Sequence, residues 1–197
     1  MYMTLALERP TKTPPLELAP RRFTYAEFEQ MSESGLFASE HVELLNGEIF
    51  VKGMQGLRHS YAVTTLTEKM IILFQSKASV AAQVPMILLS PPPDFVEPDL
   101  MLRKLPTSRY ATQNTTSEDA ILVIEVSDTT LERDQNAKLR AYARNKIPEY
   151  WILNLHTNQL EVNRNPDNED YLETNKYKAG QTVAPLEFLQ SRLEWWV

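Results

Sequence analysis

The sequence contains no cysteine and only 5 glycines in 197 residues. Without cysteine, the chain cannot form disulfides, thiolate zinc sites, iron–sulfur clusters or cysteine nucleophiles. The glycines form no phosphate-binding loop of the Walker or Rossmann type, and no Gly-x-Ser-x-Gly motif occurs. These absences argue against nucleotide-driven, dehydrogenase and nucleophile-elbow hydrolase chemistry. The lack of cysteine also suits a reducing compartment, so we expect a cytoplasmic location.

Long apolar runs and a surplus of basic residues are absent as well. No stretch approaches the roughly 18 apolar residues that suggest a membrane span, and we see no secretory signal at the N-terminus. The chain has 20 Lys and Arg against 26 Asp and Glu, a formal net charge of −6. A protein that coats DNA through its overall charge is expected to be basic. Any contact with nucleic acid must therefore be local, or helped by bound cations.

The prolines divide the chain into two parts. Four of the 13 prolines interrupt residues 1–20, which lack an apolar period and which we interpret as a flexible N-terminal arm. Residues 21–197 are long enough to bury one sizeable core and short for two cores. We therefore expect one domain over residues 21–197.

Several local signals predict a mixed, twisted sheet with helices packed on it. Thr24, with Glu27 three residues later, predicts a capping box at the start of a helix that ends near residues 34–35. Asn46-Gly47 between two apolar runs predicts a β-hairpin. Residues 121–126 form a continuous apolar run typical of a central strand buried on both faces. Other patterns predict helices over 59–77 and 131–145, strands over 84–89, 97–102 and 150–155, a surface loop over 106–119, and short strands toward the C-terminus.

Acidic residues occupy four positions where an acid is unexpected. Glu43 lies in an apolar segment, Asp99 follows Pro98 at the start of a predicted strand, and Asp134 lies on the helix that follows the central strand. Glu125 is embedded within that central strand. Burying an unpaired carboxylate costs several kcal/mol or forces it to protonate. Glu125 therefore needs a partner, either a cationic side chain or a divalent metal.

Asp99 and Glu125 lie on separate predicted strands, 26 residues apart. If the strands are neighbours, the two carboxylates can converge at one end of the sheet. Carboxylates together with water and a backbone carbonyl suit a hard cation such as Mg²⁺ or Mn²⁺. Two ordinary alternatives remain open, because Asp99 can be a turn residue and Glu125 can belong to a buried ion pair.

Several further segments accompany these acids in a set order. They are residues 22–28, 42–49, His59, 97–99, 124–127, Asp134 with Lys138 and Tyr142, and 147–153. In this order and spacing they resemble the PD-(D/E)XK nuclease superfamily, and more fully the Uma2 family (DUF820), proposed endonucleases that are abundant in cyanobacteria. The resemblance covers residues 21–155 and rests on the whole set, since each segment alone is a weak signal.

The resemblance implies a restriction-endonuclease-like α/β core, a mixed twisted sheet flanked by helices. It also implies a metal-dependent endonuclease that hydrolyses phosphodiester bonds of DNA. Asp99 and Glu125, with Glu43 as an additional acid, would be the ligands of Mg²⁺ or Mn²⁺, and the Val126 carbonyl could be a further ligand. Glu48, beyond the predicted hairpin turn, competes with Glu43 for this role.

The sequence departs from the superfamily motif at one position. The motif expects lysine two residues after the second acid, where this chain has Ser127. The resemblance suggests that Lys138, on the following helix, has taken over the role of that lysine. Asp134 and Lys138 are separated by four residues and share a predicted helix face, so Asp134 could orient Lys138 or be only its ion-pair partner. His59 could be a proton carrier, a phosphate contact, or an ordinary capping residue.

Two questions about activity and assembly stay open. The chain has Ser127 where the motif expects lysine, and its net charge is acidic. Both features favour an alternative to an endonuclease, a catalytically silent nuclease-like module that binds nucleic acid or a protein partner. Residues 131–146 hold five basic and two acidic side chains, which suits either a phosphodiester substrate or an ordinary solvated helix. Cutting both strands of a duplex generally needs two sites, so we expect a homodimer. Trp195 and Trp196 could lie on a dimer surface or pack internally.

Overall fold

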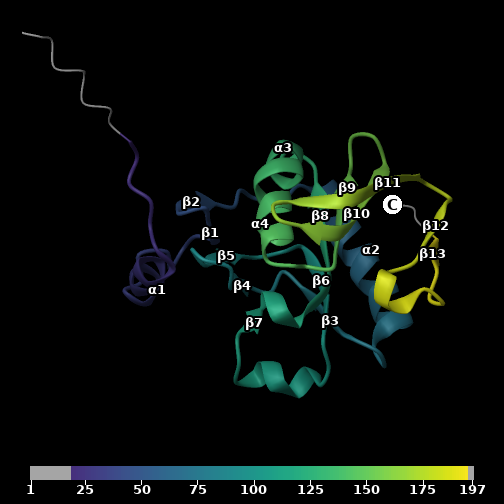
Figure 1. Cartoon of the computed structure of the whole chain (residues 1–197), viewed down its shortest axis with the longest axis horizontal. Helices are drawn as coiled ribbons and strands as arrows, with labels where there is room; N and C mark the ends of the chain where they lie inside the picture. The colour runs from purple at the N-terminus through teal and green to yellow at the C-terminus, as the bar shows by residue number, and fades with distance from the viewer. Residues whose placement is uncertain (1–18, 195–197) are drawn as a thin grey trace, which may run out of the picture.

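The computed structural model describes residues 19–194. Almost all of the N-terminal arm expected over residues 1–20 lies outside the described residues, and so do Trp195 and Trp196. Figure 1 shows α1 (Tyr25–Glu33) at one end of the described chain and strands β12 (Thr182–Val183) and β13 (Leu193–Glu194) at the other.

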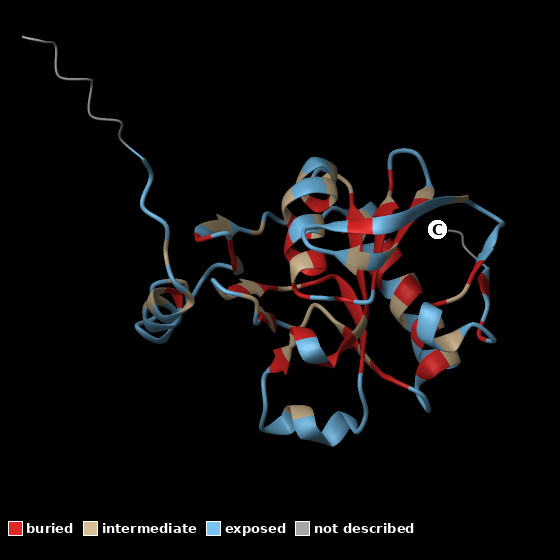
Figure 2. Cartoon of the chain, viewed as in Figure 1, coloured by how far each residue is buried: buried red, intermediate tan, exposed pale blue. Residues whose placement is uncertain are grey.

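A six-stranded sheet forms the centre of the fold. Its strand order is β11-β10-β9-β8-β6-β3, and β8 pairs in parallel with β9 and antiparallel with β6. Buried residues gather on β6, β8 and β9 in the middle of this sheet, whereas the edge strand β11 is mostly exposed (Figure 2). The strands are β3 (Ser79–Ala82), β6 (Leu100–Arg103), β8 (Ala120–Ser127), β9 (Glu149–Asn154), β10 (Gln159–Asp167) and β11 (Asp170–Lys178).

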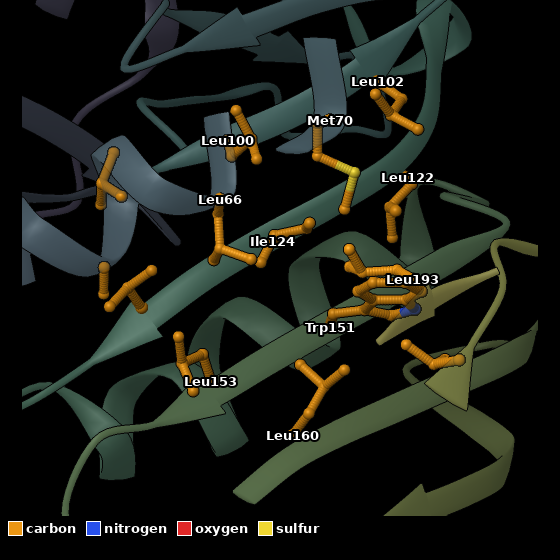
Figure 3. Packing of buried hydrophobic residues seen from close by; sticks show 14 of the residues in the cluster. Leu66, Met70, Leu100, Leu102, Leu122, Ile124, Trp151, Leu153, Leu160 and Leu193 are labelled. Carbon is orange, nitrogen blue, oxygen red and sulfur yellow. The ribbon is translucent and has the colours of Figure 1, made fainter. Parts of the chain in front are cut away.

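Alternation along β8 places its side chains on two faces of this sheet. Leu122 and Ile124 belong to the core on the face covered by α2 (Leu57–Phe74), together with Leu66 and Met70 of that helix (Figure 3). Val123 belongs to the core on the opposite face. Because side chains alternate along a strand, Glu125 shares the second face with Val123. The prediction of a central strand buried on both faces is confirmed.

The second face of the large sheet is covered by a helix and by a smaller sheet. The helical segment runs through α3 (Leu131–Arg133), η3 (Asp134–Lys138) and α4 (Leu139–Arg144). The smaller sheet has the order β2-β1-β5-β4-β7. Its strands are β1 (Val42–Leu45), β2 (Glu48–Val51), β4 (Met86–Leu88), β5 (Asp94–Val96) and β7 (Thr115–Thr116).

The two strongest local signals formed the elements they predict. Thr24 caps α1, and its hydroxyl and the carboxylate of Glu27 complete the capping box. Asn46 and Gly47 connect β1 to β2 with positive φ angles of 52° and 75°. Both angles suit a two-residue hairpin turn whose twist matches that of the strands.

Three predicted elements differ from the structure. Strand β6 begins at Leu100 rather than at residue 97, since Pro98 has no N–H to donate to a ladder. The surface loop predicted over 106–119 holds short elements, because polar side chains satisfy one another there, as between Thr116 and Asp119. The C-terminal part is not limited to short strands, because β10 and β11 form a long hairpin. The loop 106–119 holds η1 (Thr107–Ala111), β7 and η2 (Ser117–Asp119), whereas η4 (Leu186–Phe188) and the β12–β13 pair lie near the C-terminus.

The helix predicted over 131–145 is interrupted by a wider turn. The N–H of Leu139 donates to the carbonyl of Asp134, five residues earlier, which makes residues 134–138 a π-helical turn. Such turns are frequent at functional sites. The predicted class, a mixed α/β fold with twisted sheets flanked by helices, is confirmed. Within residues 19–194, the structure contains no helix that is both long and apolar enough to cross a bilayer.

Candidate active site

A cavity of about 380 Å³ opens where β8 ends and where the chain enters β6. One wall is the loop 51–56 that connects β2 to α2, and another is the turn 128–130 that follows β8. The side chains that line the space between these walls are His59, Asp99, Glu125, Arg133 and Lys138. The predicted convergence of Asp99 and Glu125 is therefore seen in the structure, because β6 and β8 are neighbouring strands.

Asp99 is held by two donors on one oxygen. Its Oδ2 lies 3.0 Å from Nε2 of His59 on α2 and accepts the N–H of Val126 at 2.9 Å. Burial raises the pKa of Asp99, but the contact with His59 and the Val126 N–H more than offset it, and the net pKa is lowered. For His59, burial lowers the pKa, whereas the neighbouring Asp99 raises it by more. Both effects favour an ionised carboxylate beside the histidine.

Glu125 is held by a lysine and a tyrosine on one oxygen. Its Oε1 accepts hydrogen bonds from Nζ of Lys138 at 2.8 Å and from the hydroxyl of Tyr142 at 2.7 Å. Burial raises the pKa of Glu125 to about 7 against the attraction of Lys138. Burial lowers the pKa of Lys138, but Glu125 and Glu43 raise it by more, so the ammonium stays charged. The site thus keeps a protonated lysine next to a carboxylate that is costly to ionise.

Glu43 lies behind Lys138 rather than in the cavity lining. Its Oε1 accepts from Nζ of Lys138 at 3.0 Å and from the N–H of Glu97 at 2.9 Å. Its Oε2 is buried, and a guanidinium nitrogen of Arg133 lies 3.6 Å away. Burial raises the pKa of Glu43, but Lys138 and the Glu97 N–H lower it by more. This geometry makes Glu43 a partner of Lys138. Glu48, its competitor, is exposed and pairs with Arg22.

Ser127 and Asp134 form a separate polar contact next to the cavity. The Ser127 hydroxyl donates to Oδ2 of Asp134 at 2.8 Å, and the Thr130 hydroxyl donates to the same oxygen at 2.6 Å. None of the ion pairs in residues 19–194 joins Asp134 to Lys138, whose ammonium lies instead between Glu43 and Glu125. The two residues are the ends of the π-helical turn, so the regular α-helical spacing assumed for them does not apply, and Oδ2 of Asp134 is taken by the two hydroxyls.

The oxygen donors of the cavity fit a hard divalent cation in part. In the described part of the chain, no three His, Asp or Glu side chains cluster closely enough to hold a metal ion by themselves. Asp99 and Glu125 each keep one oxygen that receives no hydrogen bond from residues 19–194. Mg²⁺ commonly binds through one or two carboxylates and fills its other positions with water and substrate phosphate. Asp99 and Glu125 fit that mode, whereas the predicted triad with Glu43 is not assembled.

The backbone of Val126 is also placed to help bind a metal ion beside Asp99 and Glu125. The Ser127 carbonyl accepts from the N–H of Leu155, so the backbone groups of Ser127 face β9. Backbone groups alternate sides along a strand, so those of Val126 face the β6 side, where its N–H meets Asp99. The Val126 carbonyl, named above as a possible further ligand, lies on the Asp99 side of β8.

Some side chains near the cavity have contacts that the sequence does not predict. Tyr142 is buried in the core, and its hydroxyl also donates to Glu125. Its position four residues after Lys138 was an available signal. The basic helix is less available to a substrate than its composition indicates, since Arg133 and Lys138 bind acids and Arg144 binds Asp94.

Comparison with known proteins gives one family and one fold. The family model of Uma2, described as "Putative restriction endonuclease", matches residues 25–195. The chain is similar to the crystal structure of "a putative nuclease belonging to DUF820 from Anabaena variabilis ATCC 29413", with a TM-score of 0.62 and 15% sequence identity. The match covers 85% of this chain and 92% of that chain, and at this identity it shows the fold. None of the curated proteins matches the chain.

Proposed function

Because the chain belongs to the Uma2 family, we propose that it is a metal-dependent endonuclease that hydrolyses phosphodiester bonds of DNA. The family and the fold support a nuclease function. One observation carries the finer proposal: Asp99 and Glu125 line the same cavity, and the ammonium of Lys138 lies against Glu125 within it. The carboxylates suit the binding of a metal ion, and a fixed ammonium beside them suits the stabilisation of the negative charge that develops on a phosphate during attack.

Asp99 and Glu125 would hold Mg²⁺ or Mn²⁺, with the Val126 carbonyl on the same side. A bound divalent metal polarises a phosphoryl oxygen and lowers the pKa of a bound water. The chain itself supplies orientation. His59 and the Val126 N–H hold one oxygen of Asp99, and Lys138 and Tyr142 hold one oxygen of Glu125, so the remaining oxygens keep fixed positions.

Lys138 is proposed to stabilise the negative charge that develops on the phosphate. Its ammonium is buried, and Glu43 and Glu125 fix it from two sides. In this proposal Glu43 positions Lys138, whereas Asp99 and Glu125 meet the metal. Asp134 holds the turn after β8 through Ser127 and Thr130 and is proposed to act only through that turn.

The proposal extends to assembly and location. Cutting both strands of a duplex needs two sites, which a two-fold symmetric homodimer would supply. We also propose that residues 21–197 act as one domain and that the protein is cytoplasmic. Analytical ultracentrifugation of the full chain tests the assembly, since a monomer at working concentrations would contradict the homodimer.

Titration calorimetry with Mn²⁺, followed by a plasmid assay, tests the function. The variants are Asp99→Ala, Glu125→Gln and the matched control Glu161→Gln, a buried acid of β10 that pairs with Lys176 outside the cavity. We expect wild type and Glu161→Gln to bind Mn²⁺ and to nick supercoiled DNA, and EDTA to abolish nicking. Asp99→Ala and Glu125→Gln should bind Mn²⁺ at least about tenfold more weakly and should not cut.

Each other outcome contradicts part of the proposal. Metal binding without cutting of DNA would favour the catalytically silent module. Metal-dependent cutting of RNA but not of DNA would correct the substrate. The absence of metal binding in wild type would leave Glu125 as the acid of a structural ion pair with Lys138.

A further inference from the structure

The loop that forms one wall of the cavity carries an exposed apolar side chain at its tip. Met54 is 104% exposed, and Val51, at the end of β2, is 57% exposed. Both line the same cavity as Asp99 and Glu125. Single exposed apolar residues are ordinary, but Val51 and Met54 share the wall of one polar cavity, so a molecule bound there would contact both.

The loop is held only at its two ends. The N–H of Lys52 donates to the His41 carbonyl, and the carbonyl of Gly56 accepts from Ser60. No hydrogen bond within residues 19–194 involves residues 53–55. A Cβ added at Gly53 would meet no atom within 4 Å. The tip of the loop therefore projects without packing, and nothing in the described chain covers Met54.

The charged side chains that line the cavity besides His59 are balanced, so before a metal ion binds they offer little electrostatic attraction for a phosphate backbone. Three cations line it, Lys52, Arg133 and Lys138, against three anions, Asp99, Glu125 and Asp128.

Each of those cations already lies beside an acid. Lys52 pairs with Glu97, Arg133 lies beside Glu43, and Lys138 lies between two acids. Proteins that bind nucleic acid through the backbone alone rely on a basic surplus. Here the side chains of the cavity provide no such surplus, so apolar contact at the mouth would add affinity for the rest of the nucleic acid to that of a metal ion held by Asp99 and Glu125.

We propose that Met54 is a wedge that enters the base stack of the nucleic acid bound at this cavity. This proposal rests on the proposed nuclease function and names how the same site holds its substrate. Apolar side chains that enter between base steps unstack them and kink the duplex. Contact with the faces of bases does not depend on sequence, because every base has an apolar face. With Val51 beside it, Met54 would hold an unstacked base at the cavity mouth while the adjoining phosphate meets Asp99 and Glu125.

Base unstacking can be measured apart from cleavage. The probes are short DNA duplexes that carry 2-aminopurine at several positions, titrated with the full chain in Ca²⁺ buffer, where a gel verifies that the DNA stays uncut. Anisotropy of a labelled duplex reports binding in the same samples. The variants are Met54→Ser, the conservative Met54→Leu, and the matched control Leu172→Ser, which removes an equally apolar, 72% exposed side chain from β11 outside the cavity.

We expect wild type, Met54→Leu and Leu172→Ser to raise the 2-aminopurine fluorescence of the bound duplex by about threefold or more. Met54→Ser should bind about tenfold more weakly and, at saturation, should leave the fluorescence near that of free DNA. Binding without a rise in wild type, or an equal rise with Met54→Ser, would overturn the wedge. Failure of wild type to bind any of the duplexes would overturn it as well.

The plasmid assay separates this proposal from the nuclease proposal. Nicking by wild type without a rise in fluorescence would leave the nuclease function standing and reject the wedge. A rise that depends on Met54, without nicking under any metal, would retain the wedge and reject the nuclease function.

Discussion

The ammonium of Lys138 lies 2.8 Å from Oε1 of Glu125, and the two side chains are 1% and 4% exposed. The same nitrogen lies 3.0 Å from Oε1 of Glu43, so one buried cation serves two buried acids. Asp99 adds a third acid to the neighbourhood, and burial raises the pKa of Glu125 to about 7. Of the cations beside these three acids, Lys138 is the one buried as deeply as they are, so a divalent cation bound here would relieve the mutual repulsion of the carboxylates.

Lys138→Met should destabilise the protein in the absence of metal. Removing one partner of a buried ion pair typically costs about 3–5 kcal/mol, because the remaining charges are left without compensation. Urea denaturation in EDTA measures the change in the free energy of unfolding. The control Lys176→Met removes the more exposed partner of Glu161 and should cost less than about 1 kcal/mol. A loss for Lys138→Met that is no larger than that of the control would show that Lys138 is not the cation these acids depend on.

Glu43→Gln should separate cutting from metal binding. Glu43 contacts Lys138 but does not line the cavity, so the affinity for Mn²⁺ should change by less than about threefold, while nicking should fall about 10- to 100-fold. Asp99→Asn, which alters a residue that does line the cavity, should weaken Mn²⁺ binding and nicking together. Calorimetry and the plasmid assay on both variants test this. A large loss of Mn²⁺ affinity in Glu43→Gln would return Glu43 to the ligand set that the sequence predicts.

The elements that the sequence predicts well are those with strong local signals. The capping box of Thr24, the Asn46-Gly47 turn and the apolar run of β8 each depend on neighbouring residues, and each appears in the structure. The convergence of Asp99 and Glu125 needed only that their strands be adjacent. The family, expected from the order of several motifs, is confirmed.

The parts that the sequence does not predict depend on contacts between distant segments. A π-helical turn at residues 134–138 has no clear local signature, and Lys138 at its end meets Glu43 and Glu125, which come from distant strands, rather than Asp134. The placement of Glu43 follows from how β1 packs beside that turn. Strand β5, only three residues long, pairs with β1 and β4 but is too short to show a period.

Gly47→Ala should destabilise the protein more than Gly180→Ala. Both glycines have positive φ angles, 75° and 84°, which cost a residue with a side chain about 1–2 kcal/mol. At Gly47 the added Cβ would also come within 2.8 Å of Cβ of Arg22, whereas at Gly180 it meets no atom within 4 Å. Urea denaturation gives the loss in the free energy of unfolding for each variant. Gly180→Ala measures the cost of the positive φ angle alone, and Gly47→Ala measures that cost together with the clash against Arg22. Equal losses would mean that the segment around Arg22 moves away without cost.

Buried tyrosines should make the stability of the protein fall steeply above pH 10. Burial and the nearby Asp134 raise the pKa of Tyr150 well above its usual value, and burial and Glu149 do so for Tyr171. In the unfolded chain these phenols ionise near about pH 10. The unfolded state therefore loses protons that the folded state keeps, and the free energy of unfolding falls as pH rises through that value.

Tyr171→Phe tests this effect at one phenol. A group whose pKa is raised this far in the folded protein lowers the free energy of unfolding by about 1.4 kcal/mol for each pH unit above its unfolded pKa. The variant loses the hydrogen bond from its hydroxyl to the Ile147 carbonyl, so it should be less stable at neutral pH, yet its stability should fall less steeply in alkali. Urea denaturation from about pH 8 to about pH 11 gives both quantities. A slope above pH 10 equal to that of wild type would mean that the phenol of Tyr171 ionises in the folded protein, against the burial seen in the structure.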